Sequence, residues 1–190
     1  MATDLFYERG FENGALREIA KSLNFTQAAL YYHFKNKDEI FFSILDRFTE
    51  MALQSIKEEL DAPTDLVAAL RSALRRHVTI NRDYAKEVKL LIEDRKLLAE
   101  EYARHVRLKE RKIFELYRRH IEKLRAADLM PPVSPTVMTF ALVAAANSVY
   151  QWYDRKGEMS IDDIAGQLGH IFMGPEVRPQ AAARKRSKVR

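Results

Sequence analysis

The sequence predicts an all-α protein of about nine helices, and three observations support that prediction. Apolar residues recur at helical spacing in every long segment, and we find no alternation of apolar and polar residues that would indicate a strand. Hydrophobic residues make up 47% of the chain, whereas glycine and proline occur only six times each, as in ordinary helical globular proteins. Capping residues also stand where the helical patterns begin.

The net charge of +5 comes from the end of the chain. Residues 175–190 hold six basic residues and one acid, and removing them from 32 and 27 leaves 26 of each sign. The basic pI therefore does not itself indicate nucleic-acid binding. The absence of cysteine excludes disulfides and thiolate zinc sites and agrees with a reducing cytoplasm. We expect a cytoplasmic protein without a signal peptide, and without membrane contact because no apolar run approaches the roughly 20 residues that a span needs.

The most specific pattern lies in residues 16–40, LREIAKSLNFTQAALYYHFKNKDEI. Asn24 suits the left-handed residue of a tight turn, and Thr26 can cap the helix that follows. Asn36, with Glu39 three residues later, can cap a third helix. The apolar spacing predicts that the first two helices face inward through Ile19, Ala20, Leu23, Phe25, Leu30, Tyr31 and Phe34. This is the layout of a helix-turn-helix, whose second helix enters the major groove of DNA.

The chemistry of this second helix predicts how it would read DNA. Gln27 is the best candidate base reader, because its amide can bond adenine with two hydrogen bonds; the alternative is a solvated surface glutamine. Ala28 and Ala29 offer only methyl contacts. The ammonium of Lys37 and the free N–H groups of the next helix could jointly hold a phosphate. The local charge is positive, with Arg17, Lys21, Lys35 and Lys37 against Glu18.

These motifs resemble the TetR family of bacterial transcriptional repressors. The resemblance rests on residues 5–11 (LFYERGF), on Ile19-Ala20 and on residues 30–37 (LYYHFKNK). It implies a homodimer that binds a palindromic, double-stranded operator and releases it when a small molecule enters the C-terminal domain. Two features depart from the family. Family members usually carry about one more turn of basic, helical sequence before the first helix, which supplies an N-terminal phosphate contact. Gly14-Ala15-Leu16 also stands where a Ser or Thr cap is usual, which removes a hydroxyl–phosphate contact.

The resemblance also assigns roles to individual side chains. It implies that Tyr31 packs its ring and directs its hydroxyl to a phosphate, and that Tyr32 and His33 reach the DNA backbone or bases. It implies a base or phosphate contact for Arg17. The alternatives are core packing for Tyr31 and a salt bridge to a neighbouring acid for Arg17.

We expect a DNA-binding domain over residues 1–45, a ligand-binding and dimerisation domain over 46–174, and a basic, disordered tail over 175–190. The apolar spacing predicts later helices over about 37–60, 65–82, 83–97, 100–127, 135–153 and 160–172.

Particular residues set the boundaries of these later helices. Residues 61–64 break the first and cap the next, Ser134 caps a helix with Pro135 at its first position, and Ser160 with Asp163 forms a capping box. The segment 137–153 is apolar nearly all round, which predicts burial on several sides.

The resemblance implies that the last two helices pair across a dimer. The residues expected there are Val137, Ala141, Ala144, Ala145, Ile164 and Leu168. The alternative is that these residues fill the core of one chain.

Several polar residues fall on the inward stripes of the C-terminal helices: His77, Asn81, Arg95, His105, Lys109 and Asn147. Each alone is more often a satisfied buried group, but together they predict an apolar pocket with a few polar anchors. Residues 147–153 (NSVYQWY), with Gly157 and 160–165, resemble TetR members that sense acyl-CoA thioesters of fatty-acid or sterol breakdown. That resemblance implies an acyl chain near Leu91, Ile92, Phe114, Tyr117, Phe140 and Tyr150. Arg95, Arg104 or Lys109 would meet the CoA phosphates.

Other functions are less well supported by the residues. A di-iron enzyme would need Glu-x-x-His pairs, and Glu101/His105 and Glu115/His120 have the wrong spacing. We find no phosphate loop, nucleophile elbow or metal-ligand cluster, so we expect neither an enzyme nor a cofactor. A TetR-type multidrug sensor ranks lower because the inward polar set is basic. A helical protein-interaction scaffold without specific DNA binding remains the other alternative.

Overall fold

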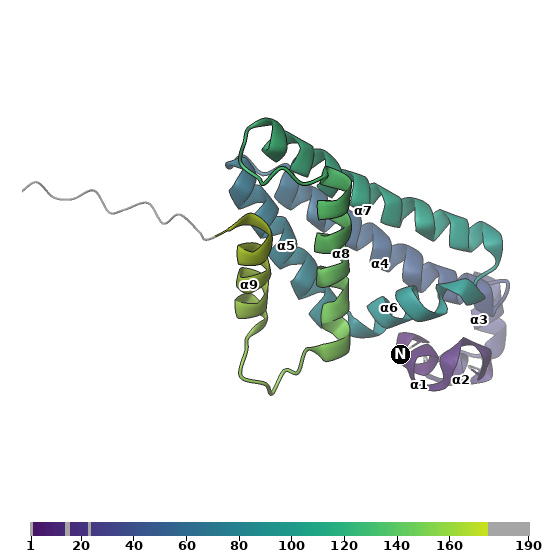
Figure 1. Ribbon diagram of the computed structural model, residues 1–190. Coiled ribbons are helices and arrows are strands. Elements are labelled where there is room, and N and C mark those ends of the chain that lie inside the picture. Colours follow the sequence, from purple (N-terminus) through teal and green to yellow (C-terminus); the bar gives the residue numbers. More distant parts are fainter. Residues whose placement is uncertain (1, 14–15, 23, 175–190) are drawn as a thin grey trace, which may run out of the picture.

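The computed structural model describes residues 2–13, 16–22 and 24–174, and every regular element in them is helical. The elements are α1 (Ala2–Asn13), α2 (Leu16–Ser22), α3 (Gln27–His33), α4 (Lys37–Leu60), α5 (Leu66–Asp83), α6 (Ala85–Lys89), the short π-helix η1 (Leu90–Asp94), the short 3₁₀ helix η2 (Arg95–Leu97), α7 (Glu100–Ala126), α8 (Pro135–Trp152) and α9 (Ile161–Met173). Helices α1–α3 lie at one end, and α4 runs from them into the larger domain (Figure 1). The prediction of an all-α protein is confirmed.

The N-terminal helices form a small aromatic core. Phe6, Phe11 and Phe41 pack with ring centroids 5.0–5.9 Å apart, and Ile19 and Leu30 are buried beside them. The turn before α3 forms as predicted, with Asn24 at a φ of 57°. The prediction that Phe25 faces inward is wrong, because Phe25 lies in the turn, where helical spacing does not apply, and is 51% exposed. Leu23, also expected inside, lies outside the described residues.

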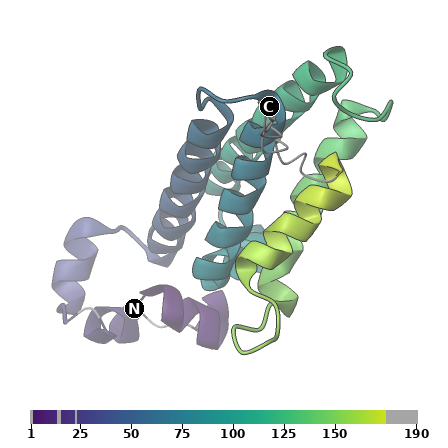
Figure 2. The ribbon, with the colours of Figure 1, turned by 90° about the vertical axis from the view of Figure 1, so that its left-hand side faces the viewer.

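A second core joins the long helices of the C-terminal domain. Helix α4 packs mainly against α5 and α7, and α5 also contacts α8 and α9, which lie side by side in Figure 2. The largest fully buried residues of this second core include Ile56, Leu70, Leu74, Tyr117, Leu124 and Leu142. None of the described helices is both long and apolar enough to cross a bilayer.

The predicted helix over 83–97 is the main departure. It is divided into α6, η1 and η2, so its hydrogen-bond spacing changes twice within 13 residues. Leu90 and Leu98, at the two ends of the irregular part, are both buried in the N-terminal core with Phe6 and Phe41. Helical spacing of apolar residues did not predict this division. The two leucines pack in the core of the N-terminal helices, whereas Val88 packs with Ile80 of α5.

Cap positions were predicted with mixed success. The capping box of Ser160 and Asp163 is present, with both N–H bonds formed. Asp65, not Thr64, caps α5: its carboxylate accepts the N–H of Ala68 at 2.8 Å. Ser134 occupies the position before α8 but its side chain makes no capping bond.

The expectation that α8 is buried on several sides is wrong for the single chain. Val137, Phe140 and Trp152 are 59%, 63% and 53% exposed, and Ala141 and Ala144 are exposed with them. Ile164, expected at the dimer contact, is instead buried in the core of its own chain. The basic tail over 175–190 lies outside the described residues.

Candidate DNA interface and ligand cavity

Helix α3 is anchored on one side and exposed on the other. The Thr26 hydroxyl accepts the N–H of Ala29 at 3.1 Å, and the buried Leu30 holds the helix on the aromatic core. Gln27 and Ala28, in its first turn, are exposed, whereas Ala29 is half-buried. The first turn is therefore open to a partner, with the Gln27 amide available.

The predicted aromatic contacts share this open face. Tyr31, Tyr32 and His33 are exposed, Tyr32 by 87%, and the rings of Tyr32 and His33 meet edge to face at 5.1 Å. Tyr31 is 54% exposed, so it is not a core residue, and its hydroxyl contact with a phosphate stays a prediction.

Two basic residues flank α3. Arg17 is exposed, and its neighbour Glu18 pairs instead with Arg9 at 2.5 Å. Lys37 begins α4 with its Nζ 4.5 Å above the ring of Phe11, so its ammonium is held against α1 at the start of α4. The Asn36 side chain caps α4 as predicted, accepting the Glu39 N–H at 2.8 Å.

A cavity of about 680 Å³ opens in the C-terminal domain, between α4, α5, α7, α8 and the α6–η2 segment. Its walls are mostly apolar, with Phe48 and Ala52 from α4, and with the ring of Phe114 from α7 tilted by 49° against that of Phe140 from α8, their centroids 4.5 Å apart. This size and lining suit a small organic molecule.

Five of the eight predicted ligand residues line the cavity: His77, Asn81, Leu91, Arg95 and Asn147. The other three do not. Tyr117 is fully buried beneath it, with its hydroxyl donating to the Ala73 carbonyl at 3.1 Å. Tyr150 packs outside, against the cluster of Phe48 and Ile80, with its hydroxyl 3.2 Å from a Glu93 oxygen, and Lys109 points to α4.

The buried end of the cavity is polar and uncharged. The Nε2 of His77 lies 3.0 Å from Oδ1 of Asn147, and Asn81 Nδ2 donates to the Ala146 carbonyl at 2.8 Å and to the same Asn147 oxygen at 3.2 Å. Burial lowers the pKa of His77 to about 4, although the hydrogen bond to Asn147 opposes that shift. The imidazole is therefore neutral at physiological pH.

The exposed end carries charges of both signs. Arg95 pairs with Glu110, Arg107 with Glu100, and Glu115 with Arg118 at 2.9 Å. Burial raises the pKa of Glu110 despite the charge of Arg95. Sequence reasoning missed four of these lining residues on α7, namely Arg107, Glu110, Arg111 and Glu115. Their successive spacings of three, one and four residues place them on one broad helical face, a signal that the sequence contains.

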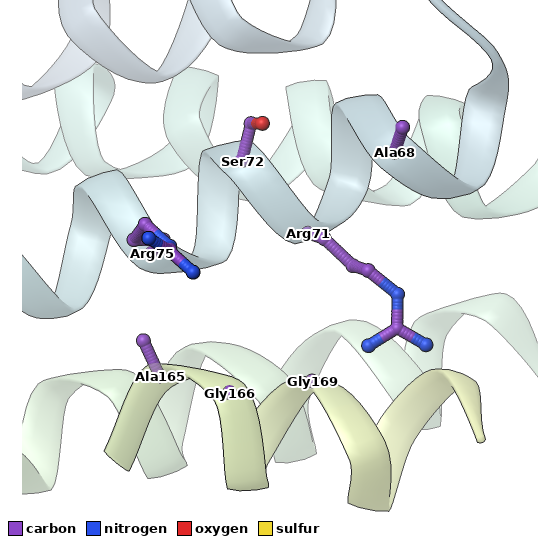
Figure 3. Close-up of a pocket in the computed structure, with 7 residues that line it drawn as sticks. All are labelled: Ala68, Arg71, Ser72, Arg75, Ala165, Gly166 and Gly169. Carbon is purple, nitrogen blue, oxygen red and sulfur yellow. The ribbon is translucent and has the colours of Figure 1, made fainter. Parts of the chain in front are cut away.

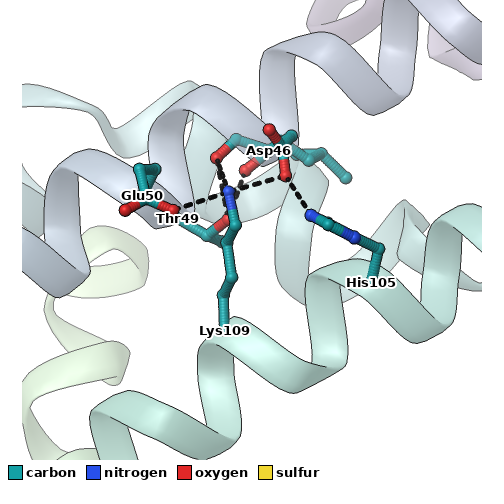
Figure 4. A network of polar contacts seen from close by, with 6 residues as sticks. Asp46, Thr49, Glu50, His105 and Lys109 are labelled. Atoms are coloured by element: carbon teal, nitrogen blue, oxygen red, sulfur yellow. Dashed lines mark hydrogen bonds and ion pairs between the residues drawn. The ribbon is translucent and has the colours of Figure 1, made fainter.

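A polar network joins α7 to α4 beside the cavity (Figure 4). Lys109, whose side chain is 11% exposed, extends from α7 to the carboxylates of Asp46 at 2.7 Å and Glu50 at 2.8 Å, and His105 reaches Asp46 at 3.1 Å. Burial alone would lower the pKa of Lys109, but hydrogen bonds to the two carboxylates and their charges raise it overall. Lys109 therefore acts as a charged link between two helices.

A smaller hollow of about 190 Å³ lies between α5 and α9. Arg71 extends across it from α5 toward α9 (Figure 3), where its guanidinium donates to the Gly174 carbonyl at 2.5 Å. A Cβ at Gly169 would lie 3.0 Å from Nη1 of Arg71, so glycine allows this close approach. The Arg71 hydrogen bond across this small hollow links α5 to the end of α9, and the larger cavity is the better ligand site. Among the described residues no cluster of His, Asp or Glu could hold a metal ion.

Comparison with known proteins agrees with this architecture. Residues 63–174 match the family model of the tetracyclin repressor-like C-terminal domain, and residues 1–44 match that of bacterial regulatory proteins of the tetR family. A stretch of 40 residues, 21% of this chain, is 48% identical to the biofilm operon icaADBC HTH-type negative transcriptional regulator IcaR of Staphylococcus epidermidis, and spans 22% of that regulator.

Two solved structures are similar over most of their length. AibR in complex with isovaleryl coenzyme A and operator DNA has a TM-score of 0.84 at 23% identity, with 92% of this chain and 95% of that chain covered, a likeness that shows the fold. A transcriptional regulator of the TetR/AcrR family from Thermobifida fusca YX-ER1 has a TM-score of 0.76 at 29% identity, with 93% and 94% covered.

Proposed function

This chain belongs to the TetR family of bacterial regulatory proteins and is a DNA-binding transcriptional regulator rather than an enzyme, and on that premise we propose that it is a homodimeric, ligand-released repressor. It binds a palindromic operator through α3 and leaves it when a small molecule enters the large cavity. An acyl-CoA thioester is the leading candidate for that molecule. The protein would work in the bacterial cytoplasm, where its DNA lies.

One observation carries this proposal: α4 belongs to both sites. Its first turns, with Ile40 and Phe41, lie in the aromatic core that holds α3, and its middle, with Phe48, Thr49 and Ala52, lines the cavity. A ligand that favours one position of α4 would therefore favour one position of the DNA-binding helices. The ligand can change operator affinity only by the difference between its affinities for the two positions.

The cavity supports an effector with an apolar body and an anionic end. Apolar side chains form most of the wall, and three arginines but only two glutamates line the exposed end. Both glutamates are already paired with arginine, whereas exposed Arg111 has no ion-pair partner among the described residues. This charge balance favours an acyl-CoA over the cations that a multidrug sensor would take. AibR, a structural neighbour, was crystallised with isovaleryl coenzyme A.

The exposed apolar face of α8 supports a homodimer. Val137, Ala141 and Ala144 are exposed at helical spacing, with small side chains that let a second helix approach closely. Two DNA-binding domains would then meet half-sites about one helical turn apart, roughly 34–36 Å.

Titration of DNA against two variants tests the DNA-binding assignments. The DNA flanking the protein's own gene is a suitable probe, with random DNA of the same length as control. Gln27→Ala should cost about 1–3 kcal/mol on the operator and little on random DNA, because it removes a base contact. Lys37→Ala should weaken both alike and lower the salt slope. Equal losses on both DNAs for Gln27→Ala would show that Gln27 is not a reader.

A panel of acyl-CoA thioesters tests the effector. A bound thioester should raise the melting temperature and release the operator fragment in the same concentration range. Stabilisation by a cationic dye and by no thioester would favour the multidrug alternative. Failure to bind any flanking DNA with preference would favour the scaffold alternative.

A further inference from the structure

The polar groups at the buried end of the cavity have a fixed orientation. The backbone carbonyl of Ala146 can only accept a hydrogen bond. The Asn81 side-chain atom that lies 2.8 Å from it must therefore be the donor, Nδ2. The same Nδ2 lies 3.2 Å from Asn147 and so requires an oxygen, Oδ1, at that position. That oxygen in turn accepts from Nε2–H of the neutral His77. The Tyr117 hydroxyl lies 3.1 Å from the Ala73 carbonyl and 3.3 Å from Nδ1 of His77, and its single proton can be donated to only one of them at a time.

This chain of bonds leaves two groups without partners. Among the described residues, no group accepts from Nδ2 of Asn147 and none donates to Oδ1 of Asn81. Both residues line the cavity, and Asn81 is only 2% exposed. A ligand that fills the cavity removes both groups from water and must offer each a hydrogen bond, since a buried polar group left unpaired costs about 1–3 kcal/mol.

We propose that the buried end of this cavity recognises a hydroxyl group carried by the apolar part of the effector. A hydroxyl both donates and accepts, so it can donate to Oδ1 of Asn81 and accept from Nδ2 of Asn147 at once. This inference rests on the proposed function only in placing an effector in the cavity; it adds the chemical group that the inner end selects.

Other groups fit the buried end less well. A ketone accepts from Asn147 but leaves Asn81 unsatisfied, and a plain hydrocarbon satisfies neither. A carboxylate or an ammonium would be buried against neutral His77 and two amides, without an opposite charge among the residues that line this end. The arginines lie at the exposed end, so an anionic group of the ligand belongs there and the hydroxyl at the opposite end.

Matched probes test the inference on the full-length protein. Octanoyl-CoA and 8-hydroxyoctanoyl-CoA differ only in the group that would reach the buried end. We expect calorimetry to give about tenfold tighter binding for the hydroxylated thioester, since one satisfied pair of polar groups is worth about 1.4 kcal/mol. Asn147→Leu, close in shape but unable to donate, should remove the preference. Arg111→Gln, at the exposed end, should weaken both probes alike and leave their ratio unchanged.

A second probe pair separates this inference from the acyl-CoA proposal. Phenol and toluene have nearly the same shape and differ in the hydroxyl alone, and neither depends on coenzyme A. If neither thioester binds, the acyl-CoA assignment fails, and a phenol preference lost in Asn147→Leu would still support the hydroxyl site. Equal binding of hydroxyl and methyl probes by the wild-type protein would overturn the inference, as would a preference that Asn147→Leu retains. The ratio of the two probe affinities is measured on the wild-type protein, so this part of the test does not depend on whether a variant folds.

Discussion

Acid should destabilise this protein through His77 before most carboxylates titrate. The imidazole is buried and neutral, with a pKa of about 4 in the folded chain against 6.5 in an unfolded one. Above pH 6.5 both states are neutral and His77 adds no pH dependence. As the pH falls from 6.5 to 4, the unfolded state binds a proton that the folded state does not, so the free energy of unfolding decreases.

The size of the effect follows from the shift. A pKa lowered from 6.5 to about 4 reduces the free energy of unfolding by about 3 kcal/mol once the pH is below both values, and by about 2 kcal/mol at pH 5. Typical stabilities are about 5–15 kcal/mol, so this loss is large enough to measure.

Urea unfolding at fixed protein concentration, at several values between pH 7.5 and 4.5, gives the measurement. Other groups also titrate in this range, so the comparison is with His77→Gln, which keeps a donor for Asn147 but cannot be protonated. The two stability curves should diverge by about 2 kcal/mol between pH 7 and pH 5. Parallel curves would refute the reasoning, as would an NMR titration in which the His77 ring of the folded protein is protonated near pH 6.5.

Three further outcomes are expected. Thr26→Ala should destabilise α3 by about 1 kcal/mol by removing the N-cap, and so weaken operator binding, whereas Thr26→Ser should retain it. Lys109→Met should lower stability by about 1–2 kcal/mol, because the pair with Asp46 is partly exposed, and should reduce the factor by which a ligand weakens DNA binding; unchanged coupling would show that the α4–α7 link is only structural. Val137→Asp should produce monomers in sedimentation experiments, with Glu58→Asp on α4 as a matched surface control.

Local chemistry explains which elements could be predicted from the sequence. The turn at Asn24, the caps at Thr26 and Ser160 and the bounds of α4 depend on residues within a few positions of one another, and each was predicted correctly. The irregular segment after α6 could not be predicted in this way. Its leucines pack against α1 and α4, which are distant in sequence, and periodicity records only that a residue is apolar.

The cavity shows the same division. Helical stripes placed His77, Asn81 and Asn147 on its wall, because buried polar residues stand out in an apolar stripe. Lys109 is also a polar residue in an apolar stripe, yet it forms an ion pair with Asp46 of α4 instead of lining the cavity. The position of a residue in a stripe does not show which neighbouring helix the residue faces. Composition alone could not predict that α8 is exposed in the single chain, because an apolar helix is equally suited to a protein core and to a dimer contact.

The shared burial of Leu90 and Leu98 with Phe6, Ile19 and Phe41 bears on how regulators of this kind can be recombined. A hybrid protein that joins residues 1–45 to the ligand-binding domain of another regulator would leave the DNA-binding domain without Leu90 and Leu98, which complete its core. The exchangeable unit is discontinuous: residues 2–13, 16–22 and 24–45 together with the stretch around 85–98. To change the operator preference of such a regulator, substituting the exposed side chains of α3 should therefore disturb the fold less than exchanging the whole DNA-binding domain.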